Sequence, residues 1–218
     1  MLKKILIAVG IILVVVIAGF LIFGYYIMKG PDVNKYDSLK SPRITQKPDQ
    51  RMLQVEAAGD PNTTKAFGLL FQTYYKNVKA RGMVAPLARW PKPLETPKAE
   101  WVGLYGLPVP ASLDKLAEAP GMPGYAVTLT TWQYGDVAEI LHVGPYSAEM
   151  PTVEKLKAFI EASGYVIAGP HEEEYLRGPG MFGKGNPEKY YTIIRYRVEK
   201  AAPQAANGGK PANRPRKK

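Results

Sequence analysis

The sequence contains no cysteine and only two histidines among its 218 residues. Without cysteine the chain cannot form a disulfide, a thiolate nucleophile, a cysteine zinc site or a thioether-linked haem. Metal or redox chemistry would therefore depend on His142, His171 and the carboxylates. The two histidines are far apart in the chain, and no acidic residue accompanies His142 at ligand spacing. We therefore expect neither a metal site nor a cofactor.

The central part of the chain also lacks an excess of charge of either sign. The net charge of +10 comes from the two ends, because residues 1–47 and residues 201–218 each carry +5. Residues 48–200 contain 17 cationic and 17 anionic side chains. A nucleic-acid-binding domain needs a basic surface that neutralises phosphates. The neutral central part therefore argues against a nucleic-acid partner.

A long apolar run occupies the N-terminal end. Residues 5–28 contain no charged side chain and are flanked by lysines on both sides. As a helix this run would span about 30 Å, the thickness of the hydrocarbon core of a bilayer. The apolar region of a cleaved signal peptide is shorter, at about 7 to 15 residues, and Tyr25 and Tyr26 suit a membrane interface. We predict that residues 1–29 form an uncleaved transmembrane anchor.

The anchor implies a single-pass protein of the bacterial inner membrane. We expect the remainder of the chain on the outer, periplasmic side, because a long C-terminal domain can be translocated largely regardless of its charge. Residues 30–49 are rich in proline and lysine and are interpreted as a linker. Residues 201–218 have no large apolar side chain, which predicts a disordered basic tail.

Residues 50–200 show one order of expected elements twice. The first copy has a strand at 51–59, a helix at 60–82 and strands at 85–90 and 100–109; the second has strands at 125–132 and 136–143, a helix at 151–164 and strands at 165–176 and 190–198. This order predicts two strand-helix-strand-strand repeats, at about 50–110 and 125–200. We expect an α+β fold with an antiparallel sheet, two helices packed on one side and a groove between the halves, preceded by one transmembrane helix.

Three segments of the second repeat resemble a known family. They are His142-Val143-Gly144-Pro145-Tyr146, Gly169-Pro170-His171-Glu172-Glu173-Glu174-Tyr175-Leu176, and the final strand from Tyr191 to Val198. These motifs are similar to those of the GyrI-like (gyrase-inhibitor-like) domain, which includes the effector-binding modules of AraC-type and MerR-type regulators. The resemblance covers about residues 50–200. It implies a tandem repeat whose groove binds small, often lipophilic or cationic molecules.

The resemblance also implies a position for the central acid of the site. The family places an acid two residues before a tyrosine, and Glu173 and Tyr175 fit that pattern. A second acid that the family sometimes carries on the last strand is replaced here by Thr192 or Ile194. Strand alternation places Glu173 on the same face as Tyr175. The alternative interpretation is that Glu173 and its two acidic neighbours form a solvated acidic edge.

Aromatic side chains are abundant, with 14 tyrosines, 6 phenylalanines and 3 tryptophans. Aromatic faces stack on flat ligands and attract cations, although most aromatic residues on strands belong to a core. The candidate ligand-binding residues beside Glu173 and Tyr175 are Trp101, Tyr105, Trp132 and Tyr190.

These observations favour a membrane-anchored binding module for lipophilic small molecules, cationic ones among them, of the multidrug-binding kind. Two alternatives stay open. One, which the resemblance implies, is a hydrolase that detoxifies reactive lipophilic compounds with Glu173 as general base toward water. The other is a protein-interaction module that sequesters a partner, whose identity the sequence does not indicate. No serine, histidine and acid form a recognisable nucleophile arrangement, so no catalytic residue is assigned.

Overall fold

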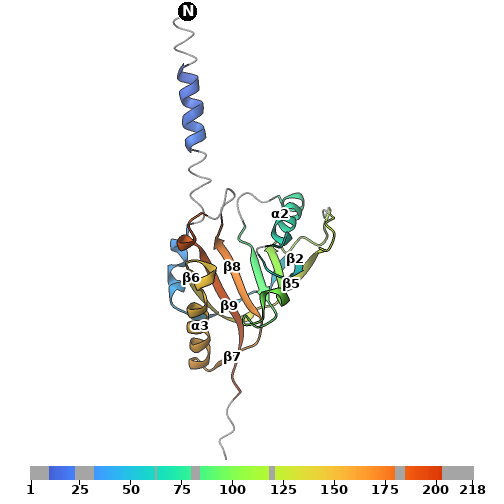
Figure 1. The fold of residues 1–218 in the computed structure, drawn as a ribbon, viewed down its shortest axis with the longest axis vertical. Helices are drawn as coiled ribbons and strands as arrows, with labels where there is room; N and C mark the ends of the chain where they lie inside the picture. The colour runs from blue at the N-terminus through green and yellow to red at the C-terminus, as the bar shows by residue number, and fades with distance from the viewer. Residues whose placement is uncertain are drawn as a thin grey trace, which may run out of the picture.

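The computed structural model describes residues 10–22, 32–61, 63–79, 84–117, 121–179 and 185–202. Figure 1 shows an α+β fold built on a large antiparallel sheet. The strands are β1 (Arg43–Lys47), β2 (Gln50–Ala58), β3 (Leu87–Trp90), β4 (Val102–Pro108), β5 (Val127–Trp132), β6 (Gly135–Val143), β7 (Tyr165–Ile167), β8 (His171–Arg177) and β9 (Tyr191–Lys200). The helices are α2 (Ala66–Asn77) and α3 (Met150–Ala162), with short 3-10 helices η1 (Asn34–Lys40), η2 (Lys98–Glu100), η3 (Tyr146–Ala148) and η4 (Pro187–Lys189).

The strands follow the same order in the two halves of the sheet. The sheet runs β1-β6-β9-β8-β3-β4-β2-β5, and β7 pairs with the end of β9. Outward from the central β3–β8 pair, each half places the second, third and first strands of its repeat in the same order. These strands are β3, β4 and β2 on one side, and β8, β9 and β6 on the other. The two repeats therefore meet at the β3–β8 pair, in the middle of the sheet.

Each repeat is preceded by a strand that pairs with the other repeat. β1 leads directly into β2 but pairs with β6, and β5 leads into β6 but pairs with β2. The interpretation of residues 30–49 as a linker is therefore wrong for residues 43–47, which form an edge strand of the sheet. Likewise, residues 127–132 extend the first half of the sheet instead of the second. The division of the chain into the predicted domains otherwise stays a prediction.

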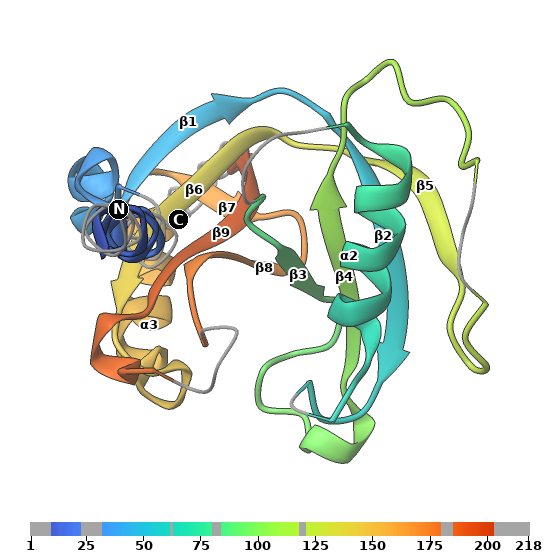
Figure 2. The ribbon, with the colours of Figure 1, turned by 90° about the horizontal axis from the view of Figure 1, so that it is seen from above.

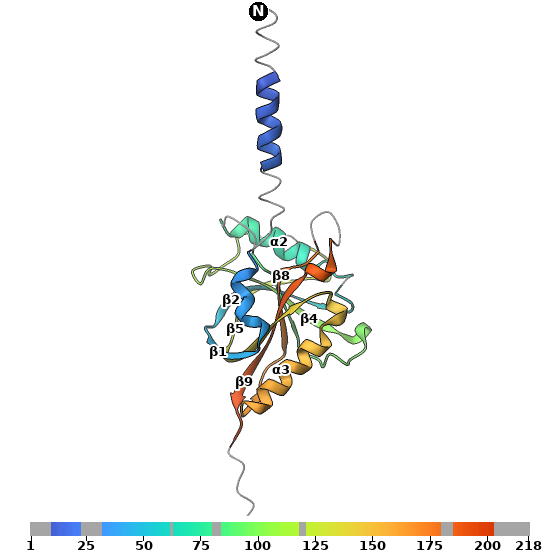
Figure 3. The same ribbon diagram turned by 90° about the vertical axis from the view of Figure 1, so that its left-hand side faces the viewer.

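Both helices pack on one face of the sheet, as predicted. α2 contributes Leu69 and Leu70 to a core cluster that also contains Val55, whereas α3 contributes Leu156 to a second cluster that also contains Ile194. Figures 2 and 3 show α2 beside β2 and β4 and α3 beside β6, at opposite ends of the face. The central strands β3 and β8 lie between these two helix-covered ends.

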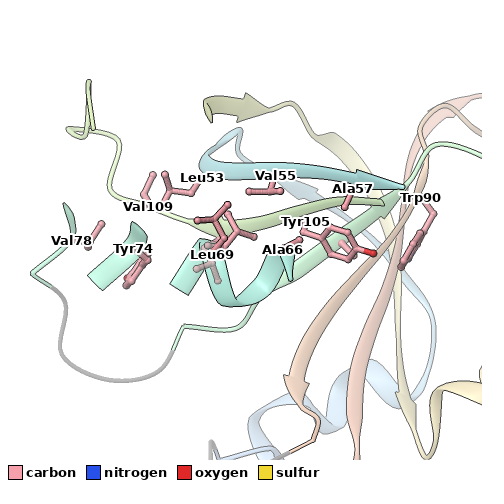
Figure 4. Close-up of a cluster of buried hydrophobic side chains, with 13 residues drawn as sticks. Leu53, Val55, Ala57, Ala66, Leu69, Tyr74, Val78, Trp90, Tyr105 and Val109 are labelled. Carbon is pink, nitrogen blue, oxygen red and sulfur yellow. The ribbon is translucent and has the colours of Figure 1, made fainter. Parts of the chain in front are cut away.

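The larger core cluster ends in aromatic side chains. It is drawn in Figure 4, where Tyr105 and Trp90 lie at the end of the cluster beyond Ala66. Both aromatic side chains are buried. They connect the core beneath α2 to the uncovered middle of the sheet, where β8 carries its acidic triplet.

The N-terminal end requires a correction. Residues 10–22 form a helix whose large side chains are exposed, and Figures 1 and 3 show this helix away from the sheet. Within the described ranges, no helix has both the length and the apolar character that crossing a membrane requires.

The predicted transmembrane helix and single-pass membrane location, with a periplasmic body, are therefore corrected. The remaining residues of the predicted anchor, 1–9 and 23–29, lie outside the described residues. Of the predicted basic tail, residues 203–218 also lie outside them.

Candidate functional site

Glu173 lies in the centre of the helix-covered face. The strand register aligns one side chain from each of seven neighbouring strands in a row. From the edge strand β5 to β6, the row reads Val127, Val55, Tyr105, Ala88, Glu173, Ile194 and Ile140. Glu173 is the only charged member of this row, and it is only 5% exposed. Its neighbour on β3, Ala88, is fully buried in the core cluster under α2.

Two side chains of the same strand hold the Glu173 carboxylate. Side chains two residues apart on a strand share a face, so His171 and Tyr175 flank Glu173. The Tyr175 hydroxyl donates a hydrogen bond to Oε2 of Glu173 at 2.7 Å. Nε2 of His171 lies 3.0 Å from Oε1, and Nδ1 of His171 lies 2.9 Å from the Tyr196 hydroxyl. The carboxylate is thus oriented on both oxygens.

A continuous series of aromatic contacts runs past Glu173 and joins the two repeats. Trp101 contacts Trp90 with ring centroids 5.2 Å apart, and Trp90 contacts Tyr105 at 5.8 Å. The series continues from Tyr105 to Phe67 at 4.9 Å and from Phe67 to Tyr175 at 5.9 Å.

The same series then enters the second repeat through the loop that follows β6. Tyr175 contacts Tyr146 at 5.6 Å, and Tyr146 contacts Tyr190 at 5.2 Å. We call the rings from Trp101 to Tyr190 the aromatic series. It provides the ring-lined surface that the sequence predicted between the halves.

Two glycines allow two of these rings to approach the backbone. A Cβ atom at Gly103 would lie 2.6 Å from the ring of Tyr105, and one at Gly178 would lie 2.5 Å from the Tyr146 hydroxyl. Both distances are too short for a real side chain, so the absence of a side chain at each glycine permits the position of its aromatic neighbour.

The electrostatic environment of Glu173 is uncompensated. Within the described part of the chain, no lysine or arginine forms an ion pair with Glu173 or with Glu149, a residue at the start of α3. Burial and the negative charge of Glu173 raise the pKa of Glu149 to about 9. Burial, followed by the charge of Glu173, also raises the pKa of Tyr105, Tyr146 and Tyr175. The basic side chain beside Glu173 is therefore the His171 imidazole, 3.0 Å from Oε1, and no lysine or arginine of the described residues accompanies it.

Four buried polar atoms have no hydrogen-bond partner among the described residues. They are Nε1 of Trp90, the hydroxyl of Tyr105, Oε2 of Glu149 and Oγ1 of Thr192, which is the register partner of Tyr175. Buried polar groups are normally hydrogen-bonded, and each exception needs a reason. A partner from outside the chain, such as water or a ligand, is one such reason.

The opposite face of the same strands carries a different arrangement. There the register places side chains of alternating charge next to one another, in the order Arg43, Glu139, Arg195, Glu172 and Arg89. Each neighbouring pair forms an ion pair, at 2.7, 2.9, 2.6 and 2.7 Å. We call these five residues the charge ladder.

The charge ladder satisfies its own carboxylates. The Tyr134 hydroxyl also donates to Glu172 at 3.1 Å. Burial alone would raise the pKa of Glu139, but Arg195 and Arg43 together lower it below its ordinary value. Glu174, which is partly exposed, pairs with Arg195 at 3.2 Å. Glu172 and Glu174 are therefore structural partners of arginine.

The cavities found in the structure lie on the ladder face. One of about 480 Å³ is lined by Lys47, Glu174 and Arg195 with residues of η1 and β1, and one of about 40 Å³ lies beside Arg89 and Glu172. On the Glu173 face, Phe67 and Tyr146 both pack against Tyr175. Neither of these two cavities lies on the Glu173 face, so the groove between the halves stays a prediction.

Of the predicted site residues, five belong to one arrangement. Glu173 lies within it, and Trp101, Tyr105, Tyr175 and Tyr190 are all members of the aromatic series. Whether they bind a ligand stays a prediction.

Trp132 is the exception, because it lies on the ladder face. Its Nε1 donates to Gln54 at 2.7 Å, and the Arg89 guanidinium lies 4.2 Å from the centroid of its ring. Strand alternation explains the error: Val127 and Leu129 of β5 pack with the core under α2, so Trp132, an odd number of residues away, faces the other side.

Several site residues were not predicted. Trp90, Phe67 and Tyr146 come from three different elements, so only the fold brings them together. His171 was considered only with His142, although its position two residues before Glu173 places it on the same face. No sequence pattern indicated Glu149 as a site residue, because it precedes a helix and approaches β8 only in the folded structure.

Comparison with known proteins identifies the fold. No protein-family model matches the chain, and no curated protein sequence matches it. Solved structures do match. An uncharacterized conserved protein from Listeria innocua aligns with a TM-score of 0.62 and 22% identity, over 77% of this chain and 99% of that one. A hydrolase from Listeria innocua aligns with a TM-score of 0.57 and 21% identity, over 77% and 99%.

The C-terminal domain of EcmrR aligns with a TM-score of 0.52 and 14% identity, over 74% of this chain and 98% of that domain. Identities this low show a common fold and no more. The shared fold is consistent with the GyrI-like fold that the sequence motifs predicted.

Proposed function

We propose that this domain binds lipophilic organic cations at the Glu173 carboxylate, between rings of the aromatic series. The observation that supports this function best is that Glu173 is buried yet has no lysine or arginine partner among the described residues. A buried carboxylate without a cation is costly. A bound cation would remove that cost.

The surroundings of Glu173 suit a ligand with both charge and apolar surface. Aromatic faces attract cations by about 0.5 to 2 kcal/mol for each contact, with the larger values in desolvated sites. Tyr175 and Tyr105 both lie close enough to Glu173 for its charge to raise their pKa. A small hydrophilic cation would lose its hydration without gaining ring contacts, so lipophilic cations are favoured.

Binding requires movement of side chains. Phe67 and Tyr146 approach Tyr175 from the first and second repeats respectively. Both are partly exposed, so their rings are free to rotate outward on the solvent side. A ligand would then separate the two rings and lie over Glu173. The unpartnered Tyr105 hydroxyl would supply one hydrogen bond.

Calorimetric titration of the full chain with tetraphenylphosphonium tests the proposal. We expect saturable binding that weakens about 10-fold or more in Glu173→Gln, since a desolvated cation contact contributes about 2 kcal/mol. Glu174→Gln is the matched control, because Glu174 is adjacent on β8 but faces the charge ladder. Neutral triphenylphosphine oxide should show no difference between the wild type and Glu173→Gln. Equal affinity of the cation for both proteins would contradict the proposal.

A hydrolase is the second candidate, and the Glu149–Glu173 pair favours it. Burial and the charge of Glu173 raise the pKa of Glu149 to about 9, so Glu149 keeps its proton at neutral pH. One protonated and one ionised carboxyl group can serve as acid and base toward a substrate and water. One structure of the same fold is described as a hydrolase.

Product analysis separates the two functions. Binding without chemistry predicts that a lipophilic ligand is recovered unchanged after long incubation. A hydrolase predicts products whose summed mass exceeds that of the ligand by one water. These products should be absent with Glu149→Gln and with Glu173→Gln, while ligand binding persists in Glu149→Gln.

A further inference from the structure

Glu149, His171 and Glu173 bring three potential metal ligands together. One ligand atom from each side chain lies within 4.8 Å of the other two. His171 and Glu173 come from β8, and Glu149 is the residue immediately before α3, at the N-terminal end of that helix. We propose that these three side chains bind a divalent transition-metal ion of the zinc type, with a fourth coordination position open toward the aromatic series.

The donor set suits a transition metal. It combines one imidazole nitrogen with two carboxylate oxygens. Zinc sites with an open position have three protein ligands of these types, and an imidazole nitrogen favours zinc over magnesium and calcium, which prefer oxygen ligands. The cluster therefore selects for the ion by its chemistry as well as by its charge.

The charge of the cluster also matches a divalent ion. Two carboxylates face each other, and no lysine or arginine of the described residues pairs with either. Oε2 of Glu149 is buried without a hydrogen-bond partner in the same part of the chain. A divalent ion would neutralise both carboxylates and give this oxygen a partner.

The surrounding hydrogen bonds orient the ligands. Metal-binding histidines commonly hydrogen-bond through their second ring nitrogen, and ligand carboxylates are held in a similar way. Here Nδ1 of His171 lies 2.9 Å from the Tyr196 hydroxyl, which leaves Nε2 for an ion. Oε2 of Glu173 accepts from Tyr175 at 2.7 Å, which leaves Oε1 on the same side as Nε2.

Binding of a metal ion would require the three ligand atoms to move slightly closer together. Ligand atoms around a tetrahedral zinc ion lie about 3.3 Å apart, given zinc–ligand distances of about 2.0 Å. Nε2 of His171 and Oε1 of Glu173 are already 3.0 Å apart. Rotation of the Glu149 side chain supplies the remaining approach, and its backbone position at the start of α3 does not need to change.

Titration of the metal-free full chain with Zn²⁺ and with Co²⁺ tests the proposal. We expect one site per chain by calorimetry, and with Co²⁺ the visible absorption bands of a tetrahedral ion with nitrogen and oxygen ligands. Glu149→Gln should weaken binding by about 100-fold or more, because loss of a supporting residue alone costs about 10- to 100-fold. Tyr196→Phe keeps all three ligands and should weaken binding by about 10-fold. Glu174→Gln, on the opposite face, should bind like the wild type.

The controls keep the outcome clear. If Glu149→Gln does not fold, as judged by circular dichroism, Tyr196→Phe decides the question. Failure of the wild type to bind either ion below millimolar concentration would overturn the proposal, as would binding that Glu149→Gln and Tyr196→Phe leave unchanged. The metal proposal does not rest on the small-molecule function. Titrations of tetraphenylphosphonium in EDTA test that function alone.

Discussion

Glu172 and Glu173 are consecutive, and both are buried, yet their carboxylates have different partners. Glu172 is 3% exposed and accepts from Arg89, Arg195 and Tyr134 on the ladder face. Glu173 is 5% exposed, and its partners are His171 and Tyr175. Because strand alternation sends them to opposite faces, one strand carries a carboxylate that arginines hold next to one that has no arginine or lysine partner among the described residues.

The difference distinguishes a structural role from a functional one. A buried ion pair that is complete within the chain has no need of a ligand, and removing one partner is strongly destabilising. A buried carboxylate without a cation lowers the stability of the protein and is available to an external partner. Burial and residue type, which are nearly equal for Glu172 and Glu173, do not make this distinction. The partners of each carboxylate do.

The largest loss of stability is expected when the charge ladder loses its central cation, Arg195. Arg195 binds Glu139, Glu172 and Glu174, so Arg195→Met would leave two buried carboxylates without their main partner. We expect a loss of about 3 to 5 kcal/mol in the free energy of unfolding, measured by urea denaturation.

Arg197→Met provides the matched control for this loss. Arg197 lies two residues further on the same strand, and its ion pair with Glu199 is exposed. Exposed ion pairs contribute little, so the cost should stay below about 1 kcal/mol. Similar losses in the two variants would contradict the distinction between the ladder and an ordinary surface pair.

The two faces should also respond to pH in opposite directions. On the Glu173 face, the folded protein keeps a proton on Glu149 up to a pKa of about 9, whereas the unfolded chain releases it near the ordinary glutamate value. The folded state therefore binds more protons in between, and stability falls as the pH rises from about 5 to 9. The limiting slope for one group is about 1.4 kcal/mol per pH unit.

On the ladder face, the pKa of Glu139 is lowered, because Arg195 and Arg43 outweigh the effect of burial. Its contribution is present above the ordinary glutamate pKa and is lost as the pH falls through the lower, folded-state value. Urea denaturation in EDTA, of the wild type and of Glu149→Gln and Glu139→Gln, measures both effects. The advantage of the wild type over Glu139→Gln should shrink in acid, and its stability relative to Glu149→Gln should fall with rising pH. If the difference in the free energy of unfolding between the wild type and Glu149→Gln does not change with pH, the pKa of Glu149 is not raised by folding.

Much of the fold could be predicted because its signals are local. Alternation over residues 136–143 and 190–198 predicted β6 and β9, and helical spacing near Leu156 predicted α3. The exchange of β1 and β5 between the repeats could not be predicted in this way. Residues 43–47 contain polar side chains at an edge of the sheet, and their pairing with β6 depends on contacts about 95 residues apart.

The candidate site shows the same difference between residues that local spacing predicts and residues that only the fold brings together. Glu173 and Tyr175 were placed on one face by their spacing alone, and the structure shows that face to be buried. Phe67, Tyr146 and Glu149 could not be assigned, because each approaches β8 from a different element of the fold. Trp132 was misplaced because an aromatic residue on a strand indicates burial but not which face it occupies.

The smallest expected change in stability concerns two buried tyrosines, one on each face of the sheet. The Tyr134 hydroxyl donates to Glu172 at 3.1 Å, whereas the Tyr105 hydroxyl has no partner in the described part of the chain. Tyr134→Phe should therefore cost about 1 to 2 kcal/mol in the free energy of unfolding, the usual contribution of a hydrogen bond to a charged group. Tyr105→Phe should change stability by less than about 0.5 kcal/mol, because it removes a polar atom that the fold does not satisfy. An equal cost for both would mean that water or another group already occupies the Tyr105 hydroxyl, and the space assigned to a ligand would then be filled.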